Sequence, residues 1–169
     1  MGEACVFGPY SRIELLEGAL VDMVSSSSAH ASVVTTLATL LDKEKSQASV
    51  RVQGAVVLSA QSVPSPDVML LRSRADRYYT AHPTAADALL VVEVADTSLE
   101  YDLEIKRSVY ARAEVEELWI VDINRREVHV FRAPHGDYSV HRVLAVNDVA
   151  AVAALGDVGF TVSALFPDQ

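Results

Sequence analysis

The sequence predicts an α/β fold of the α+β type, in which helices flank a mixed sheet that continues into an antiparallel C-terminal extension. Two patterns support this prediction. Residues 88–123 follow the order strand, helix, strand, so their two strands should be parallel and joined by a right-handed crossover. Residues 127–132 and 138–146 flank the turn-forming segment PHGD and predict an antiparallel hairpin that extends the sheet.

The composition is that of a small globular protein. The chain has 169 residues and 50% of them are hydrophobic, so a single domain over residues 1–169 can bury a core without disulfides. Cys5 is the only cysteine, which is typical of the reducing cytoplasm. The first residues lack the pattern of a secretory signal, and no apolar run approaches the roughly 18 residues that cross a bilayer. We therefore expect a cytoplasmic protein without a membrane segment.

The N-terminal part predicts a hairpin followed by a helix. Residues 12–23 (RIELLEGALVDM) suggest two short strands around Glu17 and Gly18, where glycine allows the positive φ of a tight turn. Over residues 29–45, apolar side chains recur every three or four positions and form one stripe, which predicts a helix with Ser28 as its N-cap.

The middle of the chain predicts two paired strands and a loop. Residues 49–59 are rich in β-branched side chains, and Gly54 suggests a bulge within this strand. Residues 67–71 should pair back on it. Residues 72–86 show no apolar period, which indicates a loop.

The crossover unit has clear local signals. Residues 88–95 (ALLVVEVA) are almost continuously apolar, as expected of a strand covered on both faces. Thr97 and Glu100 predict a capping box for a helix that ends near residue 113, and residues 117–123 predict another buried strand. A short strand over 158–162 and a helical turn over 163–166 complete the prediction.

Three charged residues stand out from their surroundings. Glu93 interrupts the apolar strand, Asp67 ends the turn-forming segment SVPSP, and Lys106 lies on the helix after Glu93. An unpaired ionised carboxylate in an apolar strand costs several kcal/mol, so Glu93 indicates a function. Two carboxylates can hold Mg²⁺ or Mn²⁺, and a lysine can orient or help to deprotonate an attacking water. Together these groups suit phosphodiester hydrolysis.

The blocks around these residues resemble the Uma-two family of restriction endonucleases, a branch of the PD-(D/E)XK phosphodiesterase superfamily. The resemblance covers nearly the whole chain: IELLEGALVDM, the PDV of residues 66–68, VVEVADTS, YDLEIKRSVYARA and VEELWIVD. It implies a restriction-endonuclease-like core sheet, with Asp67 at the second core strand and Glu93 on the third. It also implies a Mg²⁺- or Mn²⁺-dependent nuclease that acts on DNA.

The resemblance assigns further site residues. Superfamily members usually carry the lysine two residues after the glutamate, where this chain has Ala95. Asp102 and Lys106 match an aspartate and a lysine that the family carries on the following helix, so Lys106 resembles a migrated catalytic lysine. Glu14 and His30 coincide with a Glu and a His of the family and are candidate accessory members of the site.

The chain also departs from the family pattern. Ala19 stands where a second glutamate is common, Ala95 and Asp96 replace a frequent Ser-Pro pair, and Glu114 replaces a glycine. The change at Ala19 leaves open a nuclease-fold protein that no longer cuts and serves as a binding or assembly module.

Several of these residues have structural interpretations as well. Asp67 alone would more often cap a turn, and His30 is as readily structural as catalytic. Asp102 and Lys106 could form only a surface pair worth about 0.3–0.5 kcal/mol, which is the favoured interpretation for Asp102, while Lys106 fits either interpretation equally. The remaining histidines lack ligand spacings such as HExxH, which argues against a zinc site. They are His82, His129, His135 and His141.

The charge bears on possible partners. A net charge of −9 argues against strong DNA affinity, because DNA-binding proteins usually replace counterions with basic side chains. Candidate DNA contacts lie in the loop over residues 72–86, although a solvated loop is the favoured interpretation. They are Arg72, Arg74, Arg77 and Tyr78. An exposed edge of the C-terminal extension and the apolar WIV run (residues 119–121) suggest a homodimer.

The sequence thus predicts a metal-dependent endonuclease acting on DNA, with Asp67 and Glu93 as metal ligands and Lys106 as the third catalytic residue. A nuclease-fold binding module is the alternative, and a hydrolase of a smaller phosphoester is a third hypothesis. All of the nuclease hypotheses require the three side chains to meet in one pocket.

Overall fold

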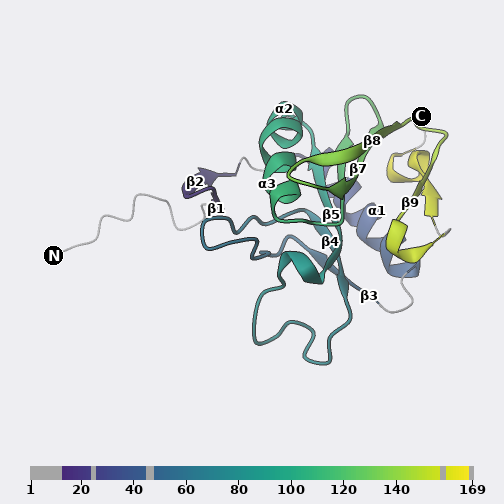
Figure 1. The fold of residues 1–169 in the computed structure, drawn as a ribbon. Coiled ribbons are helices and arrows are strands. Elements are labelled where there is room, and N and C mark those ends of the chain that lie inside the picture. Colours follow the sequence, from purple (N-terminus) through teal and green to yellow (C-terminus); the bar gives the residue numbers. More distant parts are fainter. Residues whose placement is uncertain (1–12, 24–25, 45–47, 157–158, 168–169) are drawn as a thin grey trace.

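A six-stranded mixed sheet organises the molecule (Figure 1). The computed structural model describes residues 13–23, 26–44, 48–156 and 159–167. The strands lie in chain order across the sheet: β3 (Ala48–Val52), β4 (Val68–Arg72), β5 (Ala88–Ala95), β6 (Glu117–Asp122), β7 (Glu127–Pro134) and β8 (Tyr138–Leu144). Only β5 and β6 pair in parallel among these strands, and the other neighbours are antiparallel. The predicted mixed sheet with an antiparallel C-terminal extension is confirmed.

Helices cover the two faces of the sheet. Helix α1 (Ser28–Glu44) packs on one face, where Leu37 shares a core with Trp119. The other face is covered by a helical stretch in three parts: α2 (Leu99–Tyr101), the π-helical segment η2 (Asp102–Lys106) and α3 (Arg107–Arg112). There Tyr110 shares a second core with Ile120. Because side chains alternate across a strand, adjacent residues of β6 supply both cores.

Two small hairpins and several short helical turns complete the fold. Strands β1 (Ile13–Leu16) and β2 (Ala19–Asp22) pair around Glu17 and Gly18, whose φ angles of 51° and 81° confirm the predicted tight turn. Near the C-terminus, β9 (Val149–Ala151) pairs with β10 (Gly159–Thr161). The 3₁₀ turns are η1 (Ala85–Asp87), η3 (Ala153–Leu155) and η4 (Val162–Leu165). None of the helices in the described ranges is both long and apolar enough to cross a membrane.

The two predicted N-caps lie one residue away from the observed positions. Helix α1 begins at Ser28, and the Ser27 hydroxyl accepts the hydrogen bond from the His30 N–H (3.1 Å). The residue before α2 is Ser98, rather than Thr97, and its hydroxyl donates to Asp102 (2.7 Å). In both places a run of hydroxyl residues offered several equivalent caps, so the sequence alone did not identify the one used.

The predicted strand over 49–59 is too long. Strand β3 ends at Val52 because Gln53 takes a φ of 48°, which a strand cannot continue through. Residues 53–67 then return to β4 by an irregular path, and Gly54 lies outside the ladder. Strand β9 was not predicted. Cys5, the predicted helix end at Lys45 and the predicted strand start at Val158 lie outside the described residues.

The WIV run cannot serve as a dimer interface. Trp119, Ile120 and Val121 lie on β6 inside the sheet and are fully buried within the chain. Their apolar character is explained by the two cores that they fill, which corrects one of the two arguments for a homodimer. The other argument for a homodimer, the exposed edge strand β8, still stands as a prediction.

Candidate active site

A cavity of about 440 Å³ lies beside the carboxyl end of β5 and gathers residues from four parts of the chain. Antiparallel pairing of β4 with β5 sets Val68 opposite Val92, so Asp67, just before β4, comes opposite Glu93. The helical stretch after β5 then crosses back over the sheet and brings Lys106 to the cavity. All six predicted site residues line the cavity: Glu14, His30, Asp67, Glu93, Asp102 and Lys106.

Asp67 is held from two sides. Its Oδ2 accepts a hydrogen bond from the backbone N–H of Val94 (2.9 Å) and lies 3.0 Å from Nε2 of His30. The carboxylate is buried and joins the start of β4 to β5 and to the first turn of α1. Asp67 is therefore more than the cap of a local turn, and His30 contacts it directly.

Glu93 lies at the centre of the cluster and is 3% exposed. Its Oε1 accepts a hydrogen bond from the Tyr110 hydroxyl (2.7 Å), and its Oε2 lies 3.1 Å from Nζ of Lys106. Burial raises the pKa of Glu93 from 4.5 to about 8, and although Lys106 opposes this rise, the neighbouring carboxylates add to it. Glu93 therefore retains a proton under conditions in which an exposed glutamate has lost it.

Lys106 connects three carboxylates. Its Nζ lies 3.1 Å from Glu93, 3.2 Å from Glu14 and 3.9 Å from Asp102. Burial alone would lower the pKa of this ammonium, but the surrounding carboxylates outweigh burial and raise it above its ordinary value. Lys106 is therefore a fixed positive charge at neutral pH rather than a general base.

The π-helical segment η2 aligns three polar side chains on the cavity side of the helix. Asp102, Lys106 and Tyr110 follow one another at intervals of four residues. In a regular α-helix, residues eight apart differ in direction by about 80°, whereas one π turn absorbs an additional residue and reduces this to roughly 20°. The π turn thus lets Asp102 and Tyr110 approach the same cluster.

Asp102 and Glu14 have structural partners inside the cluster. Asp102 is 3% exposed and accepts a hydrogen bond from Ser98, so the predicted surface pair with Lys106 is wrong and the pair is buried. Burial raises the pKa of Asp102. Glu14 accepts a hydrogen bond from the backbone N–H of Ser65 (2.8 Å) through its other oxygen, which attaches strand β1 to the cavity wall.

The donor set of the cavity fits a divalent cation. Four buried carboxylates, Glu14, Asp67, Glu93 and Asp102, face a single ammonium and one imidazole. Burial raises the pKa of Glu93 and the neighbouring carboxylates raise it further, and a dication would favour its ionised form. Carboxylate oxygens are also the ligands that Mg²⁺ and Mn²⁺ prefer.

The candidate DNA contacts of the loop lie outside the cavity wall. Arg72 pairs with Glu116 (3.0 Å) and Arg74 pairs with Asp76 (2.9 Å). Tyr78 is buried and its hydroxyl donates to the Arg72 carbonyl (2.6 Å), so its ring cannot stack on a base, which corrects that assignment. Arg77 is exposed.

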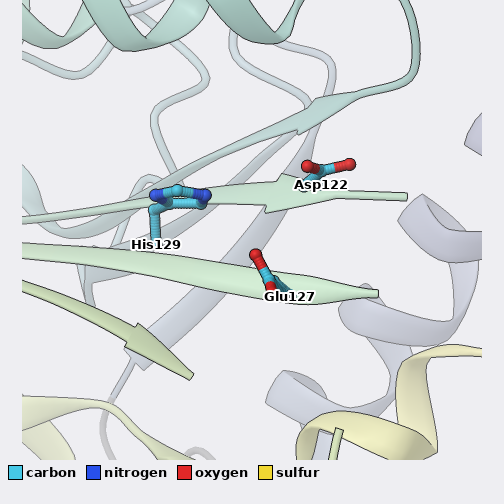
Figure 2. A group of neighbouring side chains, drawn as sticks. All are labelled: Asp122, Glu127 and His129. Carbon is cyan, nitrogen blue, oxygen red and sulfur yellow. The ribbon is translucent and has the colours of Figure 1, made fainter. Parts of the chain in front are cut away.

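Sequence reasoning missed two features. Tyr110 was not among the predicted site residues, although a buried tyrosine hydroxyl needs a hydrogen-bond partner, and its spacing of four from Lys106 was a usable signal. The second feature is a group formed by Asp122, Glu127 and His129, drawn in Figure 2. Its members come together across two strands, which a search for spacings such as HExxH does not detect.

Comparisons with known proteins agree with this fold. The profile of the Uma2 family, described as "Putative restriction endonuclease", matches residues 3–163. The structure is similar to a crystal structure of "a putative nuclease belonging to DUF820" from Anabaena variabilis ATCC 29413, with a TM-score of 0.73. That alignment has 14% sequence identity and covers 91% of this chain and 89% of the other, so the likeness concerns the fold. Among curated proteins, no sequence matches this chain.

Proposed function

Since the chain belongs to the Uma2 family of restriction-endonuclease-like proteins, we propose that it is a Mg²⁺- or Mn²⁺-dependent endonuclease that hydrolyses phosphodiester bonds of DNA. One observation supports this proposal above the others. Asp67, Glu93 and Lys106, which are separated in sequence by up to about forty residues, line one cavity, as metal-assisted hydrolysis requires.

The proposed roles follow from the contacts. Asp67 and Glu93 would hold the metal ion, which when bound supplies Lewis-acid polarisation of the scissile phosphate. The Val94 N–H and His30 fix the orientation of the Asp67 carboxylate. Lys106 is protonated, so it would stabilise the negative charge that develops on the phosphate oxygens rather than remove a proton from water.

A divalent ion and a phosphate group would both have to bind in the cavity of an acidic protein. The net charge of −9 therefore predicts weak DNA affinity and strong dependence on the metal, because the metal ion offsets the carboxylates that would repel the phosphate.

The test is cleavage of supercoiled plasmid and of single-stranded DNA with Mg²⁺ or Mn²⁺. We expect the wild type to cut, and Asp67→Asn and Lys106→Met to lose activity by about 10²-fold or more. Glu104→Gln and Lys43→Met are matched controls, because both side chains are exposed, and they should cut normally. Cleavage that persists in the Asp67 and Lys106 variants would defeat the assignment. Turnover of a nucleotide panel without DNA cleavage would favour the smaller phosphoester instead.

One contact favours a second candidate function, that of a nuclease-fold binding or assembly module. Lys106 already neutralises Glu93 and Glu14, and Ala19 stands where the family commonly has a glutamate. This candidate predicts no heat on titration with Mn²⁺ and no hydrolysis. Heat that is lost in Asp67→Asn would exclude it.

A further inference from the structure

A second group of side chains that can bind metals lies where the turn joins β6 to β7 (Figure 2). The ladder pairs Asp122 of β6 with Glu127 of β7, and His129 follows Glu127 on the same side of its strand. One ligand atom from each residue lies within 4.8 Å of the other two. In Figure 2, a ring nitrogen of His129 faces the two carboxylates.

The imidazole of His129 has one nitrogen engaged and one without a partner. Its Nδ1 lies 3.2 Å from Nε2 of His141 on β8. Its Nε2 is buried and makes no hydrogen bond with any residue of the described ranges, and the residue is only 9% exposed. Buried polar atoms in folded proteins nearly always have a partner, so this nitrogen indicates a ligand that completes the site.

The contact with His141 prepares that nitrogen for a metal ion. When the Nδ1–H of His129 donates a hydrogen bond to His141, Nε2 of His129 carries a free lone pair. This is the tautomer that binds a metal ion through Nε2. Histidine ligands commonly have their other nitrogen fixed by a hydrogen bond in this way.

Asp122 supplies a second unsatisfied atom. It is 1% exposed, and its Oδ1 accepts the backbone N–H of Arg125 (3.0 Å). Its Oδ2 makes no hydrogen bond within the described part of the chain and has an Arg125 guanidinium nitrogen at 3.6 Å. The Arg125 side chain is 68% exposed, so it can move into solvent and give way to a bound cation.

We propose that Asp122, Glu127 and His129 form a site for a divalent first-row transition metal such as Zn²⁺ or Co²⁺. An imidazole ligand favours these ions over Mg²⁺, whose ligands are oxygens. Metal bonds of about 2.0–2.2 Å hold tetrahedral ligands roughly 3.4 Å apart, so a small rotation of the half-buried Glu127 would close the group around the ion. The three residues leave at least one coordination position for water.

This site is separate from the candidate active site. Glu93 pairs with Ile120, and Ile120 pairs with His129, so Glu93 and His129 are two strand spacings apart, roughly 10 Å. A metal here would join the ends of β6 and β7, and its presence does not depend on any nuclease activity.

Titration of the metal-free chain with Co²⁺, followed by visible absorption, tests the proposal. The wild type should show the Co²⁺ spectrum of a nitrogen-containing site, in addition to any ion held at the candidate active site, and His129→Gln should lose that spectrum. His135→Gln is the matched control, because His135 is an exposed histidine of the β7–β8 turn, and it should bind as the wild type does. Arg125→Gln should bind several-fold more tightly, because it removes the competing cation.

Thermal unfolding gives an independent reading. Zn²⁺ at about 100 times its Kd should raise the melting temperature of the wild type by roughly 5–10 °C more than that of Glu127→Gln or His129→Gln. Glu127 is half-buried, so its variant should keep the fold even where the His129 variant does not, as circular dichroism would show. Equal Co²⁺ spectra in the wild type and in folded Glu127→Gln would overturn the proposal, as would a wild type that binds no Co²⁺.

Discussion

At the scale of single residues, Glu93 has the largest consequences. A carboxylate buried in the sheet meets the Tyr110 hydroxyl on one oxygen and the Lys106 ammonium on the other. Burial raises the pKa of this carboxyl while Lys106 opposes the rise, so Glu93 changes the negative charge of the cavity as pH changes. The stability of the metal-free protein and its affinity for a dication should therefore depend on pH through the same group.

Stability of the metal-free protein should fall as pH rises through the range set by Glu93. Its pKa is raised from 4.5 to about 8, so in this interval the folded chain holds a proton that the unfolded chain has released. The stabilisation is complete below pH 4.5 and is lost as pH rises through about 8. Urea denaturation in a chelator across this range measures it, and Glu93→Gln should flatten the curve. An equal slope in that variant would assign the effect to another group.

Tyr110→Phe should separate positioning from packing. The change keeps the aromatic ring in the core and removes only the donor to Glu93, at a cost of about 1–3 kcal/mol in unfolding free energy. The ionised form of Glu93 loses a hydrogen bond in this variant, so the pKa of Glu93 should rise further. A higher pH should then be needed before Mn²⁺ binds tightly. Tyr138→Phe, which loses a hydrogen bond to the Val115 carbonyl, should cost similar stability without this shift.

At the scale of secondary-structure elements, the helical stretch after β5 determines which side chains reach the cavity. The π turn in η2 contains Glu104 and Ile105, which are exposed, while Asp102 and Lys106 are buried. A π turn has poorer hydrogen-bond geometry than an α-helix and is often found at functional sites. Here its effect is to keep Asp102 in line with Tyr110.

Deletion of Ile105 should convert the π turn to a regular helix. Seven residues of α-helix turn by about 700°, roughly 20° short of two full turns, so Asp102 would stay on the same side as Tyr110. We therefore expect DNA cleavage within a few-fold of the wild type, because Leu103 also keeps its direction toward the core. Insertion of one alanine after Ile105 would instead rotate Asp102 by about 100° relative to Tyr110, and should lower cleavage at least tenfold. Full activity in the insertion variant would show that the alignment is not needed.

The strands were more predictable than the helix ends. The apolar run of residues 88–95 matches β5 residue for residue, because a strand buried on both faces leaves a continuous hydrophobic signal. By contrast, the sequence did not indicate which of Ser26, Ser27 and Ser28 caps helix α1. The π turn has no sequence signature at all, since its poorer hydrogen bonding is compensated by contacts with residues far away in the sequence.

At the scale of the whole molecule, the sequence could identify which residues belong to the candidate site. It could not identify which of them contact one another. Glu93 could be selected because a charged group in an apolar strand is unusual, whereas Asp67 and Lys106 could be selected only together with the family resemblance. The pairing of Lys106 with Glu14 could not be foreseen, because it depends on how the β1–β2 hairpin packs on the sheet. The group at Asp122 was missed for the same reason, since a strand register is a tertiary property.

The exposed edge of β8 is the feature that still supports the predicted homodimer, because the WIV run is in the core. We expect a homodimer in light scattering, and Val140→Lys should reduce it to a monomer, because a lysine on an edge strand opposes strand-to-strand pairing. Val149→Lys changes a more exposed valine on β9, away from this edge, and should remain dimeric. A wild type that is monomeric at all concentrations would end the dimer hypothesis.

The crossover from β5 to β6 has a consequence for the newly made chain. All residues proposed for catalysis have been synthesised by position 106, but β5 then lacks the parallel neighbour that covers its second edge. A strand without that ladder is not a rigid support, so the carboxylates and the ammonium would have no fixed arrangement. A chain that ends before residue 117 would thus contain every residue proposed for catalysis and should lack the fixed arrangement that the proposed activity needs.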